Sequence, residues 1–171
     1  DQDSDNNTTE SIHKLADIYH SQISIVGRPS APTSAANSYT ESFYRNSNQY
    51  QNFSSQYNNR KQIVLAGSNG GMLHAFYSST GEELWAFIPP SLLSKLRQVE
   101  SSKSKSSNSI YGVDGSPVVK DIFYNNKWHT VVISGLGRGG HSYFALDITD
   151  INNPKHLFTF DNNLESSSII V

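Results

Sequence analysis

The sequence predicts a mainly β protein built as a β-propeller, and three observations support this. A compact apolar strand, a glycine-rich turn and a returning strand occur twice, first around Gly67 and again around Gly135. These two glycines lie 68 positions apart, with strand-like segments in matching order around each. Turn residues separate the segments. Four short strands that recur between turns describe one propeller blade, so the chain contains about two blades.

The first repeat occupies residues 17–100 and follows a polar linker over 1–16. Strand-type runs of apolar and β-branched residues, bounded by turn residues, lie at 22–26, 62–67, 72–77 and 83–88. Asn69-Gly70 predicts a tight hairpin turn, because both central residues of such a turn adopt positive φ. Ser91 is expected to cap a short helix after the last of these strands, 83–88.

The second repeat occupies residues 110–171, and its last residues, 168–171, are expected to start the next blade. Asn125-Asn126 predicts a turn between its first two strands. The strand-type runs lie at 118–123, 128–134, 143–147 and 156–160. A blade buries its faces only against neighbouring blades, so two blades leave their outer faces open. We therefore expect a piece of a larger propeller, able to self-associate through those faces.

An insertion over about 30–59 interrupts the first blade and is rich in Ser, Asn, Gln and Tyr. Its aromatic residues recur mostly at spacings of 3, 4 or 7, which predicts one or two short helices. A connection of this length is often functional. Two interpretations stay open, since the aromatics either pack a helix onto the adjacent sheet or bind a partner. Exposed tyrosines anchor protein interfaces, so the candidate partner-binding residues are Tyr44, Tyr50 and Tyr57, with Arg138 in the second glycine-rich turn.

Composition narrows the function classes. The formal net charge is −2 and no long basic stripe is present, so nucleic-acid binding is not expected. The absence of cysteine excludes disulfides, thiolate metal sites and cysteine nucleophiles. No apolar run approaches the roughly 20 residues of a transmembrane helix.

The sequence provides no catalytic, cofactor or metal residues. Gly135, Gly137 and Gly140 match a dinucleotide-binding pattern, but a strand-like segment follows where that chemistry requires a helix. The six histidines lack metal-ligand spacing, although a zinc site assembled only by the fold stays open. Asp114 and Asp147 are expected to fix turns through hydrogen bonds to nearby backbone amides.

Several segments resemble the C-terminal propeller of the PilC/PilY family of type IV pilus tip-associated proteins. The most specific is 67–76 (GSNGGMLHAF), followed by 81–89 (GEELWAFIP). Three more match in order, namely 17–22 (DIYHSQ), 111–117 (YGVDGSP) and 135–147 (GLGRGGHSYFALD). The blade motifs are shared with quinoprotein-like propellers. The family's usual Ala-Asn-Asp-Gly is replaced here by Ser-Asn-Gly-Gly, which preserves the turn chemistry.

The resemblance implies a non-enzymatic type IV pilus biogenesis and adhesion module of an exported bacterial protein. The implied location is the pilus tip, outer membrane or cell surface. The implied partners are pilus proteins (minor pilins) and a host-cell or surface receptor. The family's calcium loop has no counterpart here, so no metal ligand is carried over and calcium is expected only elsewhere in a full-length member. The alternatives are a quinoprotein-like dehydrogenase propeller and an outer-membrane assembly scaffold.

Overall fold

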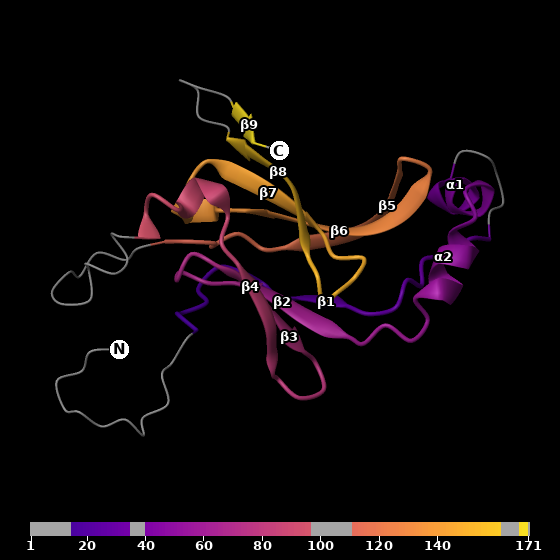
Figure 1. Cartoon of the computed structure of the whole chain (residues 1–171), viewed down its shortest axis with the longest axis horizontal. Coiled ribbons are helices and arrows are strands. Elements are labelled where there is room, and N and C mark those ends of the chain that lie inside the picture. The colour runs from indigo at the N-terminus through magenta and orange to yellow at the C-terminus, as the bar shows by residue number, and fades with distance from the viewer. Residues whose placement is uncertain (1–14, 35–39, 97–110, 162–167, 171) are drawn as a thin grey trace, which may run out of the picture.

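The computed structural model describes residues 15–34, 40–96, 111–161 and 168–170. Within these residues the chain forms two antiparallel sheets (Figure 1). The first has the order β1-β2-β3-β4 and comprises Ser24–Val26, Ile63–Gly67, Leu73–Tyr77 and Glu83–Phe87. The second has the order β5-β6-β7-β8-β9 and comprises Val118–Tyr124, Lys127–Gly135, Ser142–Asp147, Lys155–Asp161 and Ser168–Ile170. Each expected strand is present.

The two sheets share one apolar core. Alternate residues of β2 and β3 point into it from the first sheet, and residues of β6 and β7 meet them from the second. Trp85 of β4 packs against this core, and its indole Nε1 donates a hydrogen bond to the carbonyl oxygen of Ile151 at 2.8 Å. The largest fully buried members are Ile63, Leu65, Leu73, Leu92, Leu136, Phe144, Leu146 and Ile148. Two sheets of four or five antiparallel strands, stacked through one face, are two adjacent propeller blades.

The N-terminal segment before β1 joins the two blades through hydrogen bonds. The Nδ1 atom of His20 lies 2.7 Å from the Asp114 carboxylate, which also accepts from the His20 backbone N–H at 3.2 Å. The Gln22 backbone N–H donates to Ser116 Oγ at 3.0 Å. Asp114 therefore joins two segments far apart in the chain, whereas the sequence predicts for it a local turn-fixing role.

The turn between β2 and β3 differs from the prediction. The residues with positive φ include Gly71, at 89°, but neither Asn69 nor Gly70, and the strands are joined by the five-residue loop 68–72. The Asn69 side chain explains the longer loop, because its amide donates to Asp17 at 2.7 Å and its oxygen accepts from the Gly112 N–H at 3.4 Å. The Asn125-Asn126 turn is confirmed, with φ values of 49° and 58°.

Two shorter elements also differ from the prediction. Ser168–Ile170 forms a strand, but it pairs with β8 and so extends the second sheet, where the sequence predicts the start of the next blade. The segment beginning at Pro90 starts with a 3-10 turn, Pro90–Leu92, in place of a regular helix. Leu96 is helical at the edge of the described part, beyond which the expected short helix stays a prediction. Residues 1–14 of the predicted linker lie outside the described part. In that part, no helix is long and apolar enough to cross a membrane.

The face of the second sheet that points away from the shared core carries an apolar row. Val118 pairs with Ile133, Ile133 with Ala145, and Ala145 with Phe158, so the row crosses four strands. Val118 is 65% exposed, Ile133 44% and Phe158 36%. Ala145, between Ile133 and Phe158, is fully buried, so the exposed part of the row consists of these larger side chains. Exposed apolar residues grouped on one face of a sheet are typical of an interaction surface. In a propeller, the corresponding face is buried against the next blade.

We expect the isolated chain to self-associate through this row. Replacing both Val118 and Ile133 with Thr keeps β-branched residues in the strands while making the surface polar, so the double variant shifts towards monomer. The measurement is molar mass by size-exclusion chromatography with light scattering. Leu93→Thr is the control, because Leu93 is similarly exposed but lies outside the row. A parent chain that is monomeric at every concentration would contradict the expectation.

Candidate functional site

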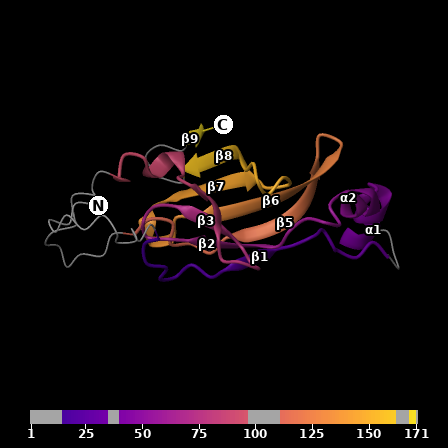
Figure 2. The same ribbon diagram turned by 60° about the horizontal axis from the view of Figure 1, so that its bottom comes forward.

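The insertion of the first blade docks on the second blade. It contains α1, Glu41–Ser47, and α2, Tyr50–Gln56. Figures 1 and 2 both place these helices beside the end of the β5–β6 hairpin. Thr40 caps α1 by accepting a hydrogen bond from the Phe43 N–H at 3.2 Å. Gln49, in the left-handed region with φ at 57°, then redirects the chain into α2.

A separate aromatic cluster holds α2 on the second sheet. Tyr50 and Phe53 of α2 are buried against Trp128 of β6, with Phe123 and Tyr57 packed around them. The Tyr50 and Trp128 rings meet edge to face with centroids 4.8 Å apart, an arrangement that aromatic pairs favour. The Trp128 indole Nε1 also donates to the carbonyl oxygen of Asn48 at 2.7 Å. The packing interpretation of the insertion aromatics is therefore confirmed for these residues.

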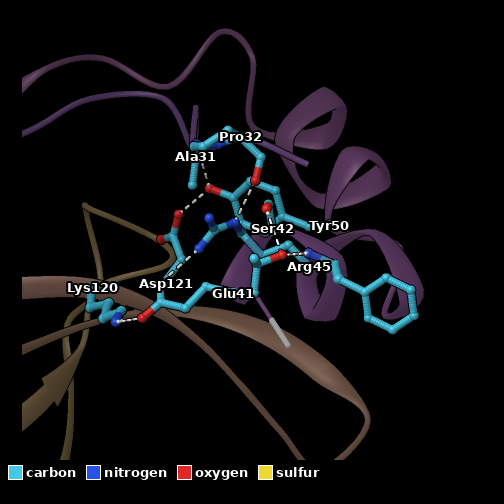
Figure 3. Close-up of polar contacts among 10 residues, drawn as sticks. Ala31, Pro32, Glu41, Ser42, Arg45, Tyr50, Lys120 and Asp121 are labelled. Atoms are coloured by element: carbon cyan, nitrogen blue, oxygen red, sulfur yellow. Dashed lines mark hydrogen bonds and ion pairs between the residues drawn. The ribbon is translucent and has the colours of Figure 1, made fainter. Parts of the chain in front are cut away.

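Polar contacts beneath the aromatic cluster also hold α2 on the second sheet. The Tyr50 hydroxyl donates to the Asp121 carboxylate of β5, as Figure 3 shows. The other Asp121 oxygen accepts from the Thr130 hydroxyl at 2.6 Å. Burial, and then the bond to Asp121, raise the pKa of Tyr50 well above its ordinary value. The phenol consequently stays protonated and serves as a permanent donor to Asp121.

The outer part of the interface is held by charged side chains. Arg45 Nε donates to the Pro32 carbonyl oxygen at 2.7 Å, and its NH1 atom pairs with Glu41 at 3.0 Å (Figure 3). The second Glu41 oxygen lies 2.7 Å from Lys120 Nζ of β5. These pairs are exposed, and surface ion pairs contribute little to stability, so the buried Tyr50–Asp121 contact carries more of the attachment.

The structure separates the four predicted partner-binding residues. The prediction is wrong for Tyr50, whose side chain is only 1% exposed because it fills the aromatic cluster. Tyr44 is 51% exposed on α1, and Tyr57 is half-buried after α2. Arg138 is exposed at the other end of β6, with its guanidinium stacked over the Tyr111 ring at 5.5 Å. Tyr44 and Tyr57 therefore stay candidate partner-binding residues of the insertion, whereas Arg138 lies on a different part of the surface.

A groove of about 570 Å³ opens between α2, the β5–β6 hairpin and the β7–β8 connection. Tyr57, Phe123 and Trp128 contribute aromatic surface to it, and His129 and Asp147 lie among its other lining residues. Six carboxamide side chains also line it, namely Asn48, Gln49, Asn52, Gln56, Asn126 and Asn153. None of these amides is predicted as a site residue from the sequence, and Asn126 is predicted only as part of a turn. The Asn and Gln content of the insertion is the signal for the four amides that the insertion contributes.

The histidines in the expected family motifs make structural hydrogen bonds. His74 is buried between Glu83, 2.6 Å from Nδ1, and Ser68, 2.9 Å from Nε2. In the groove, His129 Nδ1 lies 2.7 Å from Asp147. Among the described residues, no group of three or more His, Asp or Glu side chains could hold a metal ion.

Asp147 combines its turn role with the pair to His129. Its carboxylate accepts from the Thr149 backbone N–H at 2.9 Å, as the turn prediction requires. Burial by itself would raise the pKa of Asp147, but the hydrogen bonds from Thr149 and then His129 outweigh burial and lower the pKa below its ordinary value. Asp147 is therefore held as a carboxylate.

The glycine pattern at 135–140 forms a turn and not a nucleotide site. Gly137–Gly139 is a single 3-10 turn, and the strand β7 follows it. Packing explains the need for glycine here, since a Cβ on Gly139 would lie 1.8 Å from the Gly112 carbonyl oxygen. The motif therefore allows the 111–117 segment to approach the β6–β7 turn.

The fold and the contacts between the blades define a segment of a β-propeller with a helical insertion. Residues 15–165 match the family model described as the PilY1 beta-propeller domain, so the chain belongs to this family. It is 38% identical over 152 residues to the type IV pilus biogenesis factor PilY1 of Pseudomonas aeruginosa strain UCBPP-PA14. That match covers 89% of this chain and 13% of the relative.

Two further comparisons agree. The PilY1 homolog of Xylella fastidiosa strain Temecula1 is 38% identical over 146 residues, which are 84% of this chain and 11% of the homolog. The crystal structure of the Pseudomonas aeruginosa PilY1 C-terminal domain aligns with a TM-score of 0.58 and 36% identity. It covers 80% of this chain and 25% of that domain. The chain thus spans a small part of the length of its relatives.

Removing the Tyr50 hydroxyl should loosen the insertion. In Tyr50→Phe the ring still fills the cluster, but Asp121 loses a donor, so we expect the free energy of unfolding to fall by about 1–3 kcal/mol. Urea denaturation measures it. Glu41→Gln, which disrupts only exposed ion pairs, should cost about 0.5 kcal/mol or less. Equal losses in the two variants would contradict the assignment of the buried contact as the main one.

Acid should weaken the fold partly through Asp147. Because the folded-state pKa of Asp147 lies below its ordinary value of 3.8, its contribution is present above that value and is lost as the pH falls through the folded-state pKa. We expect Asp147→Asn to show a smaller loss of stability than the parent on acidification below about pH 4. Urea denaturation at a series of pH values tests this. Glu82→Gln, at an exposed site, should retain the parent's pH dependence.

Proposed function

We propose that this chain acts in type IV pilus biogenesis, as a non-enzymatic binding segment of a pilus-associated propeller. The observation that supports this is the match over residues 15–165 to the PilY1 beta-propeller domain, together with 38% identity to proteins named as type IV pilus biogenesis factors. The similarity extends over nearly the whole chain, so it includes both blades and the insertion that bridges them.

The pilus assignment is favoured over the two alternatives from the sequence. A quinoprotein-like dehydrogenase and an outer-membrane assembly scaffold share blade motifs with this chain, but the matching family and relatives are pilus factors. In the proposed role, these residues provide rigid binding surfaces and carry no cofactor, and any calcium site belongs to another part of a longer protein.

The proposal includes partners and a location. The partners are pilus proteins such as minor pilins and, for adhesion, a receptor on a host cell or other surface. The location is outside the cytoplasm, at the pilus tip, the outer membrane or the cell surface. The names of the relatives as pilus biogenesis factors support a pilus-related location.

A chimera tests the proposal. Residues 15–165 replace the matching segment of Pseudomonas aeruginosa PilY1, and surface pili are counted by electron microscopy. We expect pili at a level close to that of the unmodified bacterium, because the two segments share their blade packing.

The matched control chimera carries two blades of equal length from an unrelated propeller. We expect this control to leave the cells without surface pili. Equal piliation with unrelated blades would show that the segment is only a spacer. Absence of pili with residues 15–165, when the chimeric protein is folded and exported, would contradict the proposed role directly.

A further inference from the structure

The groove beside α2 extends beyond the first hollow. A second hollow of about 490 Å³ shares Gln56, Tyr57, Thr149 and Asp150 with the first, so the two follow one another along the surface. Each volume lies within the range of about 300–1,000 Å³ typical of small-molecule sites. Two hollows in series form an elongated site, suited to a ligand of several linked units.

Carboxamide groups dominate the polar lining. The second hollow adds Asn59 and Asn152 to the six amides of the first. A carboxamide donates through its nitrogen and accepts through its oxygen, so it matches neighbouring hydroxyl groups, which also donate and accept. Within the described part of the chain, the side chains of Gln56, Asn126 and Asn153 have no hydrogen-bond partner. These amides are available to a ligand.

The charges in the first hollow balance. Lys127 and Lys155 are offset by Asp147 and Asp150, and His129 lies against Asp147. In the second hollow, Arg60 is committed to the Gly27 carbonyl oxygen and the Thr130 hydroxyl, and Lys61 Nζ lies 4.9 Å from the centroid of the Tyr77 ring. The first hollow therefore has no net charge, so it has little attraction for a highly charged ligand and lacks the cation cluster that phosphate backbones need.

Aromatic rings provide the apolar part of the lining. Tyr57 and Phe123 are half-buried and line the first hollow, so each retains accessible ring surface. The Tyr57 ring contacts Phe53, with centroids 5.0 Å apart, and the Arg60 guanidinium, whose Cζ lies 5.9 Å from the ring centroid, so these two neighbours hold the ring in place. Flat apolar surfaces next to dense donor and acceptor groups suit a ring that carries hydroxyls at its edge and C–H groups on its faces.

We propose that this groove binds a neutral oligosaccharide. The saccharide hydroxyls pair with the carboxamides, and the sugar faces lie against the rings of Tyr57 and Phe123. A peptide fits less well, because extended peptides are held mainly by the backbone of a free strand edge, whereas this groove is walled by side chains of a helix and two connections. The inference extends the proposed adhesion role by naming a ligand class. Its biological importance rests on that role, whereas the binding itself depends only on the residues of the groove.

The test uses the full chain on an array of neutral and acidic glycans, followed by titration calorimetry with the strongest neutral one. The groove variant combines Gln56→Ala, Asn126→Gly and Asn153→Ala. Glycine accepts the φ of 58° at position 126, and alanine is favoured in a helix, so the backbone is preserved. We expect the groove variant to bind at least tenfold more weakly than the parent.

The matched control combines Gln51→Ala with Asn125→Gly. Gln51 is exposed on the same helix, and Asn125 has positive φ in the same turn, but neither lines the groove. The control should bind within twofold of the parent, and urea denaturation should show that both variants are folded. Three outcomes overturn the inference. In the first, the parent binds no neutral glycan more strongly than the groove variant does. In the others, the control loses as much affinity as the groove variant, or the parent binds only acidic glycans.

The result is independent of the pilus assay. Loss of glycan binding with normal piliation in the chimera leaves the biogenesis role intact. Normal glycan binding with failed piliation contradicts biogenesis and not the groove.

Discussion

The apolar layer between the two sheets determines most of this structure. Burial of side chains such as Ile63 and Phe144 removes large apolar surfaces from water, which is the main favourable contribution to folding. A blade has two faces, however, and this layer covers only one face of the second sheet. The row of Val118, Ile133 and Phe158 on the other face therefore remains exposed. The same alternation of side chains that builds the core thus also creates the surface on which a further blade would pack.

The insertion adds a second connection between the blades, of a different physical kind. Its helices have seven residues each, too few to be stable alone, so their conformation depends on docking. Docking is specific because Tyr50 must bury its ring beside Trp128 and also satisfy the Asp121 carboxylate. If α2 moved, the Asp121 oxygen that faces Tyr50 would lose its donor, although Thr130 would still serve the other oxygen. A partly buried acceptor without its donor costs more than an exposed ion pair contributes, so Asp121 favours one position of α2 on the sheet. A segment that belongs to the first blade in sequence thereby becomes part of the second blade's surface.

The strands could be predicted from sequence because each is a local pattern of apolar residues between turn formers. The helices of the insertion were also predictable from aromatic spacing, but their docking site was not. Tyr50 pairs with Asp121, 71 positions away, and no local pattern encodes that distance. The same limit explains Asn69, whose turn signal was overridden by contacts to Asp17 and Gly112. The groove escaped prediction because its amides come from three separate segments that only the docked insertion brings together.

Two amides of the groove occupy backbone positions that other residues would stabilise better. Their presence there therefore calls for an explanation other than backbone preference. Asn52 lies inside a seven-residue helix, where Asn is less favourable than Ala by about 0.7 kcal/mol or less. Gln49 occupies a left-handed conformation that glycine would adopt more easily. Neither residue contributes to the aromatic cluster that anchors α2. Docking of the insertion thus accounts for Tyr50 and Phe53, but not for a wall of uncharged donors and acceptors facing a charge-balanced hollow. Three of the amides also order the insertion, since Asn48 donates to the Tyr44 carbonyl oxygen at 2.8 Å and Asn52 to Gln49 Oε1 at 3.1 Å. The other amides make no such contact among the described residues, and the proposed ligand binding accounts for them.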